Sequence, residues 1–182
     1  MYLFFDTETT GLPKDPSAPT TDFENWPRLV QLAYILYDET GKLILSEDFI
    51  VKPDGFIIPE PSSQIHRITN ERALSEGHEI KDVLKRFEEF VRKSQYLVAH
   101  NVYFDKKIVG SEYLRNGFED CLQYKKKICT MMGPSSHFKG WKSLTELHTR
   151  LFGSGFEEAH NAAVDIQATA RCFWEMRKRN II

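Results

Sequence analysis

Two acidic residues, Asp6 and Glu8, stand one position apart at the end of the first apolar run, Tyr2 to Phe5. In a strand, alternate side chains point to the same side, so a strand that continues to residue 8 places both carboxylates on one face. Like charges repel there, and burial disfavours their ionised forms. A divalent cation would offset both effects. The pair therefore predicts half of a metal site.

Two further aspartates lie near the ends or starts of later predicted strands and helices. Asp105 comes just after the short apolar segment Tyr96 to Ala99, and Asp165 lies in the first turn of the last predicted helix. In open α/β sheets, ligands gather beyond the carboxyl ends of the strands. Together with the two earlier acids, these residues would bind Mg²⁺ or Mn²⁺ through oxygen. An Asp in the first turn of a helix more commonly caps backbone amides. Asp105 or Asp165 alone is therefore weak evidence for a metal site, and the evidence is the combination of all four acids.

The segments that must position these side chains alternate between strand and helix patterns. The expected strands are the opening run and residues 29–37, 42–51, 96–99 and 127–131. The expected helices are 79–93, 104–115, one capped by Thr69, one starting at a capping box at Ser143, and one running from Asn161 to about Arg179. Residues 52–61 hold three prolines and are expected to be irregular. A hairpin followed by crossovers predicts an α/β fold with a mixed sheet.

The composition is that of a water-soluble globular chain. With 182 residues, 41% of them hydrophobic, we expect a single domain over residues 1–182. The net charge of −2 argues against a nonspecific nucleic-acid coat. Three cysteines without a C-x-x-C pair argue against a zinc site and a disulfide framework. No signal-peptide core or membrane span is apparent, so the expected location is cytoplasmic, with no membrane partner.

At three places the chain resembles the motifs of one family, the DnaQ-like 3′–5′ exonucleases. Residues Asp6 to Leu12 are similar to the first motif and His100 to Asp105 to the second. Residues His160 to Asp165 are similar to the third, in the DEDDh subclass, which carries a His five positions before the last Asp. This family includes the proofreading epsilon subunit of bacterial DNA polymerase III. The resemblance implies a ribonuclease H-like fold, with a five-stranded mixed sheet flanked by helices.

The resemblance also implies catalytic roles. Asp6, Glu8 and Asp165 would hold the metal that activates water, and Asp6 would bridge to a second ion that Asp105 supports. The implied cofactors are thus two divalent cations, Mg²⁺ or Mn²⁺. His160 would be the general base, because imidazole titrates near neutral pH and can accept a proton.

Five further residues are implied to contact the substrate: Thr9, Gly11, Leu12, His66 and Phe104. Leu12 and Phe104 would flank the terminal nucleotide with apolar and stacking contacts, although an aromatic residue is about equally often part of a core. Thr9 and Gly11 would offer backbone contacts. The segment around His66 commonly has Gly in the family where this chain has Arg67.

The implied activity is removal of nucleoside 5′-monophosphates from single-stranded 3′ ends, with DNA as the expected substrate and a DNA polymerase as a candidate partner. An RNA-directed exonuclease of the same family, oligoribonuclease-like or RNase T-like, is one alternative. A noncatalytic polymerase-docking module that binds nucleic acid is another. A glycosidase with two acids accounts only for Asp6 and Glu8.

Two other segments are expected to meet the substrate. Residues Pro13 to Arg28 form a long loop beside the first motif, and we expect this loop to influence substrate choice. Residues Ser135 to Lys142 mix aromatic and basic side chains, a composition typical of nucleic-acid contacts.

Overall fold

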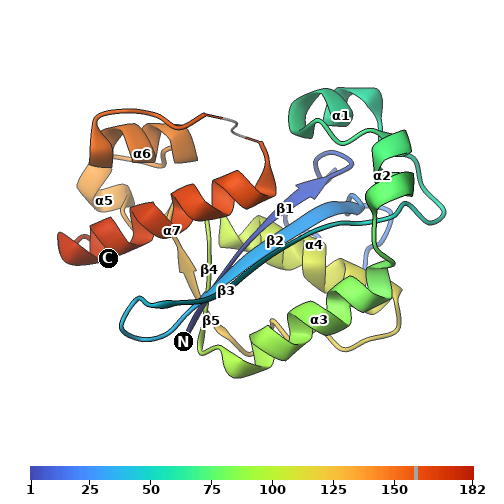
Figure 1. Ribbon diagram of the computed structural model, residues 1–182, viewed down its shortest axis with the longest axis horizontal. Helices are drawn as coiled ribbons and strands as arrows, with labels where there is room; N and C mark the ends of the chain where they lie inside the picture. The colour runs from blue at the N-terminus through green and yellow to red at the C-terminus, as the bar shows by residue number, and fades with distance from the viewer. Residues whose placement is uncertain (158–159) are drawn as a thin grey trace.

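The computed structural model describes residues 1–157 and 160–182, in which a five-stranded sheet lies between layers of helices (Figure 1). The strands are β1 (Tyr2–Thr9), β2 (Leu29–Tyr37), β3 (Leu43–Ile50), β4 (Tyr96–Ala99) and β5 (Lys126–Cys129), in the order β3-β2-β1-β4-β5. β2 pairs antiparallel with β1 and β3, whereas β4 pairs parallel with β1 and β5. The mixed sheet predicted from the hairpin and the crossovers is confirmed.

The helices follow the predicted start signals. They are α1 (Glu60–His66), α2 (Asn70–Glu76), α3 (Ile80–Lys93), α4 (Val102–Arg115), α5 (Ser135–Phe138), α6 (Leu144–Phe152) and α7 (Ala162–Lys178). The Thr69 hydroxyl accepts the N–H of Arg72 at the start of α2, and Ser143 forms a capping box with Glu146 before α6. The Asn161 side chain accepts an N–H of α7. None of the described helices has the length and apolar character needed to cross a bilayer.

Three elements differ from the expectation. Residues 52–61 are not irregular throughout, because α1 begins at Glu60 with a proline in its first turn, where the missing N–H has no helical partner to lose. α5 is a single unexpected turn. β5 ends at Cys129 instead of Met131, since its partner strand β4 ends at Ala99, directly opposite.

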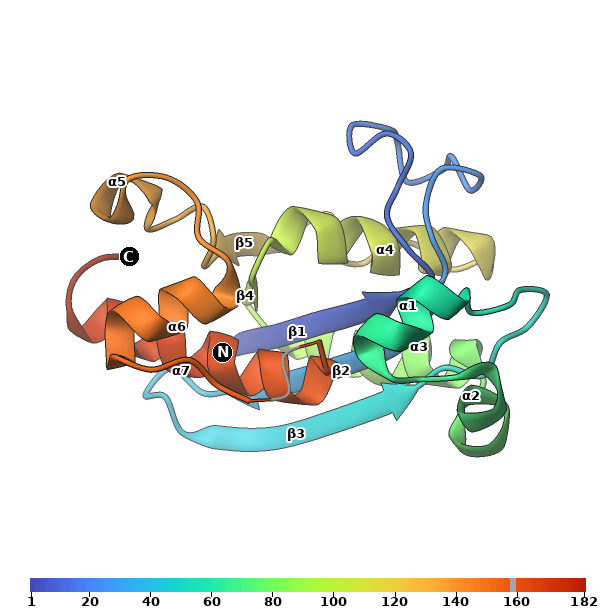
Figure 2. The ribbon, with the colours of Figure 1, turned by 90° about the horizontal axis from the view of Figure 1, so that it is seen from above.

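β1 is buried on both faces, which explains its apolar sequence. Phe4 packs against Phe173 of α7 with ring centroids 5.1 Å apart. Phe5 points to the opposite face and packs against Phe87 of α3 at 5.6 Å. Figure 2 shows α7 and α4 on the two sides of the sheet. Even-numbered residues of β1 thus face α7, and odd-numbered residues face α3 and α4.

The last part of β1 has a strand neighbour on only one side. β4 pairs with β1 over Tyr2–Phe4 only, whereas β2 runs along the whole of β1. After β4 the chain turns at Asn101, whose φ is 79°, and enters α4. The first turn of α4 therefore lies beside the stretch of β1 that carries the two acids.

Candidate active site

Three carboxylates converge at the end of β1. Asp6 and Glu8 face α7, and Asp165 lies in the first turn of that helix. One carboxylate oxygen from each of the three residues lies within 4.8 Å of the others. The strand period and the packing of α7 together create this cluster.

The surroundings of these acids disfavour their ionised forms. The pKa of Asp6 is raised well above its usual range, first by burial and then by the charges of Asp105, Asp165 and Glu8. Burial, followed by Asp165 and Asp105, raises the pKa of Glu8 to about 8. The pKa of Asp165 is also raised, mainly by burial. A divalent cation would stabilise all three as carboxylates.

The donor set fits such a cation. Asp165 Oδ2 accepts the backbone N–H of His160 at 2.9 Å. Its other oxygen, Oδ1, is buried and accepts no hydrogen bond from the residues that the structure describes. A buried carboxylate oxygen without a donor is costly. Oxygen ligands of this kind suit Mg²⁺ or Mn²⁺.

Asp105 reaches the site from the other face of the strand. Its Oδ1 accepts the backbone N–H of Thr7 at 3.1 Å and the Thr7 hydroxyl at 2.7 Å. Burial raises the pKa of Asp105 to about 7 in spite of these hydrogen bonds. Asp105 does not belong to the three-oxygen cluster, but its charge raises the pKa values of Asp6 and Glu8. The fourth carboxylate therefore lies beside the cluster.

His160 lies at the exposed rim of the site. Its backbone has a φ of 70° and its side chain is exposed. The hydrogen bond from its N–H fixes the chain next to Asp165, and the charged imidazole lowers the pKa of that carboxyl. The His160 side chain is thus open to solvent, while its backbone N–H contacts the carboxylate of Asp165.

Gln31 of β2 lies outside the three motifs and connects β2 with β3 and with the start of α7. Its Nε2 donates to Asp48 Oδ1 of β3 at 2.8 Å, and its Oε1 accepts the N–H of Ala162 at 3.3 Å. Gln31 also pairs with Glu8 in the β1–β2 ladder. This buried amide thus holds the start of α7 against the sheet. A polar residue inside an otherwise apolar strand was the signal that could have identified it.

All five substrate-contact candidates line one cavity of about 250 Å³: Thr9, Gly11, Leu12, His66 and Phe104. Glu8 lines the same cavity and joins it to the carboxylates. Ser62 and Ile65 of α1 complete its wall, a contribution that could not be predicted while residues 52–61 were expected to be irregular. The structure thus brings together side chains from β1, α1 and α4.

The predicted substrate-contact residues differ in exposure and in hydrogen bonding. The Leu12 side chain is 84% exposed, so it is free to contact a ligand. The Thr9 hydroxyl donates to the carbonyl of Gly11 at 2.7 Å and shapes the turn. Gly11 has a φ of 150°, which a residue with a side chain rarely adopts. His66 is buried, its Nδ1 accepts the N–H of Ile68, and burial lowers its pKa.

Solved structures with the same fold include those of exonuclease I. The complex of Escherichia coli exonuclease I with single-stranded DNA superimposes with a TM-score of 0.78 and 21% identity, over 98% of this chain and 40% of that one. Its complex with a dT13 oligonucleotide gives a TM-score of 0.79 at 21% identity, over 98% and 41% of the two chains. The expected ribonuclease H-like fold is confirmed.

Relatives by sequence are DNA polymerases. The PolC-type DNA polymerase III of Lactococcus lactis is 30% identical over an alignment 190 positions long, gaps included, which covers 98% of this chain and 10% of the polymerase. That of Streptococcus sanguinis is 31% identical over 172 residues, 93% of this chain and 11% of the polymerase. The chain thus spans about a tenth of the length of these relatives.

The model of the RNase T exonuclease family matches residues 3–173, which contain all three motifs. The resemblance to DnaQ-like enzymes is thereby confirmed, and this chain belongs to the exonuclease family.

Proposed function

We propose that this chain is a 3′–5′ exonuclease that uses two divalent cations and releases nucleoside 5′-monophosphates from single-stranded 3′ ends of DNA. The observation that carries the proposal is the cluster of Asp6, Glu8 and Asp165, in which one buried oxygen has no donor among the described residues. Residues 1–182 would act as one catalytic domain.

In this proposal Asp6, Glu8 and Asp165 would hold one cation, and Asp105 would support the second together with Asp6. When bound, Mg²⁺ or Mn²⁺ lowers the pKa of the attacking water and stabilises negative charge on the phosphate. His160 takes the proton of that water and passes it to solvent, to which its side chain is exposed. Water adds to phosphorus as the bond to the 3′ oxygen breaks. The leaving 3′ oxygen takes a proton from solvent, so the products are a nucleoside 5′-monophosphate and a strand with a new 3′ hydroxyl.

The terminal nucleotide would occupy the 250 Å³ cavity lined by His66, Leu12 and Phe104. DNA is the proposed substrate because the two relatives named above are DNA polymerases and the two solved exonuclease I structures named above are complexes with DNA. A DNA polymerase is accordingly the proposed partner. A noncatalytic docking module would have no need for a carboxylate cluster that is costly without a cation.

The test is degradation of end-labelled single-stranded DNA, duplex DNA and short RNA, each with Mg²⁺, Mn²⁺ or EDTA. We expect stepwise shortening from the 3′ end of single-stranded DNA, and no reaction in EDTA. Asp6→Asn should abolish cleavage while the chain stays folded.

Faster degradation of RNA would favour the oligoribonuclease-like or RNase T-like alternative. Cleavage that survives EDTA or Asp6→Asn would disprove the metal mechanism. Deletion within residues 13–28 should change the preference between these substrates.

A further inference from the structure

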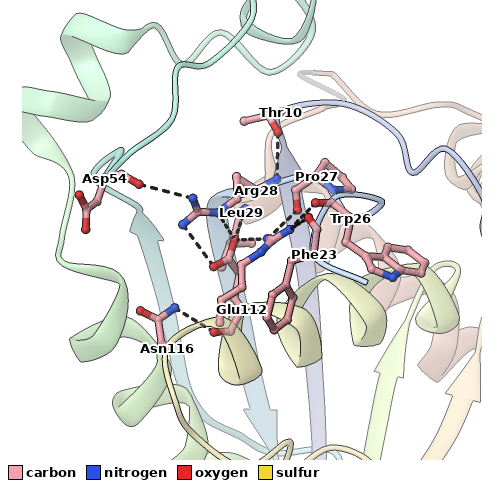
Figure 3. Close-up of polar contacts among 10 residues, drawn as sticks. Thr10, Phe23, Trp26, Pro27, Arg28, Leu29, Asp54, Glu112 and Asn116 are labelled. Atoms are coloured by element: carbon pink, nitrogen blue, oxygen red, sulfur yellow. Dashed lines mark hydrogen bonds and ion pairs between the residues drawn. The ribbon is translucent and has the colours of Figure 1, made fainter. Parts of the chain in front are cut away.

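One buried carboxylate, that of Glu112 on α4, holds the chain at the start of β2 (Figure 3). Its side chain is 1% exposed and lies outside the three motifs. The Oε1 atom accepts Arg28 Nε at 2.8 Å, Arg115 Nη1 at 3.0 Å and the backbone N–H of Leu29 at 3.2 Å. Removing one partner of such a buried ion pair is strongly destabilising, because the other charge is then left unpaired.

Arg28 connects this carboxylate to the turn that follows Glu8. The backbone N–H of Arg28 donates to the Thr10 hydroxyl at 2.9 Å, and its carbonyl oxygen accepts the N–H of Thr10 at 3.0 Å. The β1–β2 ladder shifts its register between Glu8 and Thr9, so these two bonds hold β1 where the regular ladder ends. On the other side of β1, β4 pairs only up to Phe4.

The turn held by Arg28 carries part of the cavity proposed for the terminal nucleotide. Gly11 and Leu12 directly follow Thr10, and both line this cavity of about 250 Å³. The Leu12 side chain is 84% exposed, so packing of the side chain itself does not fix its place. The position of this wall therefore depends on the backbone that carries it, and that backbone is bonded to Arg28.

Arg115 shares the carboxylate with Arg28 and fixes the loop of residues 13–28. Its guanidinium donates to the carbonyl oxygens of Phe23 and Trp26, each at 2.5 Å. Burial lowers the pKa of Arg115, the charge of Glu112 opposes this effect, and the charge of Arg28 adds to it. The two guanidinium groups thus repel each other, and the Glu112 carboxylate compensates that repulsion.

We infer that Glu112 is a positioning residue for the wall of the nucleotide cavity, acting through Arg28 on the turn of residues 10–12. The inference rests on the proposed function. The carboxylate cluster depends on other contacts, since Asp165 lies on α7 and Gln31 ties the start of α7 to the sheet. Loss of the Glu112 charge should therefore weaken substrate binding and leave the chemical step almost unchanged, which raises KM without lowering kcat.

The test measures amide hydrogen exchange at Thr10 by nuclear magnetic resonance, together with steady-state cleavage of single-stranded DNA. Glu112→Gln keeps the shape of the side chain and removes its charge, so the two guanidinium groups are left uncompensated. We expect exchange of the Thr10 amide to become about tenfold faster, because its bond to Arg28 opens more often. KM should rise about tenfold, with kcat within about threefold of the native value.

Glu47→Gln is the matched control, because Glu47 also pairs with an arginine, Arg86, at 2.7 Å, but connects β3 with α3. It should leave the exchange at Thr10 and the KM at their native values. If Glu112→Gln does not fold, Arg28→Met decides. That substitution removes the link and leaves Glu112 paired with Arg115, and it should raise both the exchange rate and KM about threefold.

Native exchange at Thr10 or a native KM in the folded variant would overturn the inference. A fall in kcat alone would also overturn it, because that result indicates a disturbed carboxylate cluster and not a displaced cavity wall. Absence of cleavage by the native chain with Mg²⁺ and Mn²⁺ would instead refute the proposed function, and the exchange comparison would still decide whether Glu112 holds the turn.

Discussion

The Asp105 carboxylate accepts two hydrogen bonds from Thr7, one from its backbone N–H at 3.1 Å and one from its hydroxyl at 2.7 Å. Thr7 lies between the two acids of β1 but points to the opposite face of the sheet. Its N–H has no strand partner on the β4 side, because the β4 ladder stops at Phe4. Asp105 thus completes the edge of β1 and brings its charge beside the carboxylate cluster.

Replacing the Thr7 hydroxyl should therefore damage both stability and activity. Thr7→Val keeps the shape of the side chain and removes one charge-assisted bond, so we expect a loss of about 1–3 kcal/mol in the free energy of unfolding. The rate of cleavage should fall about tenfold, because Asp105 loses a positioning contact. Denaturant unfolding and single-turnover cleavage measure the two effects. Thr7→Ser keeps the hydroxyl, so its stability and cleavage rate should be close to those of the native chain. If Thr7→Val had the native stability and rate, the Thr7 hydroxyl would not position Asp105.

The cluster should lower the stability of the metal-free protein. Glu8→Gln removes a charge from a site that raises the pKa of Glu8 to about 8. In EDTA near neutral pH we expect Glu8→Gln to raise the free energy of unfolding by about 1–3 kcal/mol. This range is lower than the pKa shift alone would give, because Glu8 is partly exposed and solvent screens its charge. With Mg²⁺ the native chain should gain stability and the variant should gain less. Glu119→Gln, at an exposed position, is the control and should change neither value.

His100 should make the fold sensitive to acid. Its Nε2 donates to the carbonyl of Lys142 and its Nδ1 bonds to the Thr130 hydroxyl, both at 3.0 Å. Burial lowers the pKa of His100 from 6.5 to about 4, so the unfolded chain takes up the proton first as the pH falls. The contribution of His100 to the free energy of unfolding should therefore decrease between about pH 6.5 and pH 4, by up to ~3 kcal/mol. The carboxyls of the active site, whose pKa values are raised, contribute with the opposite sign.

The measurement is the free energy of unfolding at several pH values across that window. Relative to its value at pH 7, the free energy of unfolding of His100→Gln at pH 4 should be higher than that of the native chain by up to ~3 kcal/mol, because the destabilising contribution of His100 is gone. His78→Gln replaces an exposed histidine and should keep the native slope. Equal slopes for all three proteins would show that His100 does not cause the effect.

Arg67 holds a left-handed conformation, which glycine adopts more readily than a residue with a side chain. It ends α1 with φ 61° and ψ 23°. Because that conformation costs a residue with a side chain about 1–2 kcal/mol, Arg67→Gly should raise the free energy of unfolding by about 1 kcal/mol. Arg67→Ala removes the same charge without relieving the backbone, so it should not stabilise. A drop in kcat/KM common to both variants would show that Arg67 contacts a phosphate.

Gln31 should act on turnover through α7. Gln31→Met removes its bonds to Asp48 and Ala162 and fills a similar volume. We expect kcat to fall about tenfold with little change in KM, because the start of α7 carries Asp165 and not the nucleotide cavity. Steady-state kinetics on single-stranded DNA test this, and a rise in KM alone would contradict it.

The sequence determined the elements whose signals are local. The apolar run of β1, the period of α3 and the capping residues Thr69, Ser143 and Asn161 predict their elements directly, because neighbours within one turn or one strand decide them. The order of the three motifs predicted the family. The α1 helix was missed since prolines that break a helix interior are also good first-turn residues.

Only the tertiary structure decided which groups meet. The faces of β1 are assigned by the packing of α7 against Phe4 and of α3 against Phe5, and this assignment sends Asp105 to Thr7 instead of into the three-carboxylate cluster. The contact of Gln31 with the start of α7 spans 131 positions of the chain. Contacts over such separations depend on how whole elements pack, and no local pattern of residue types contains that information.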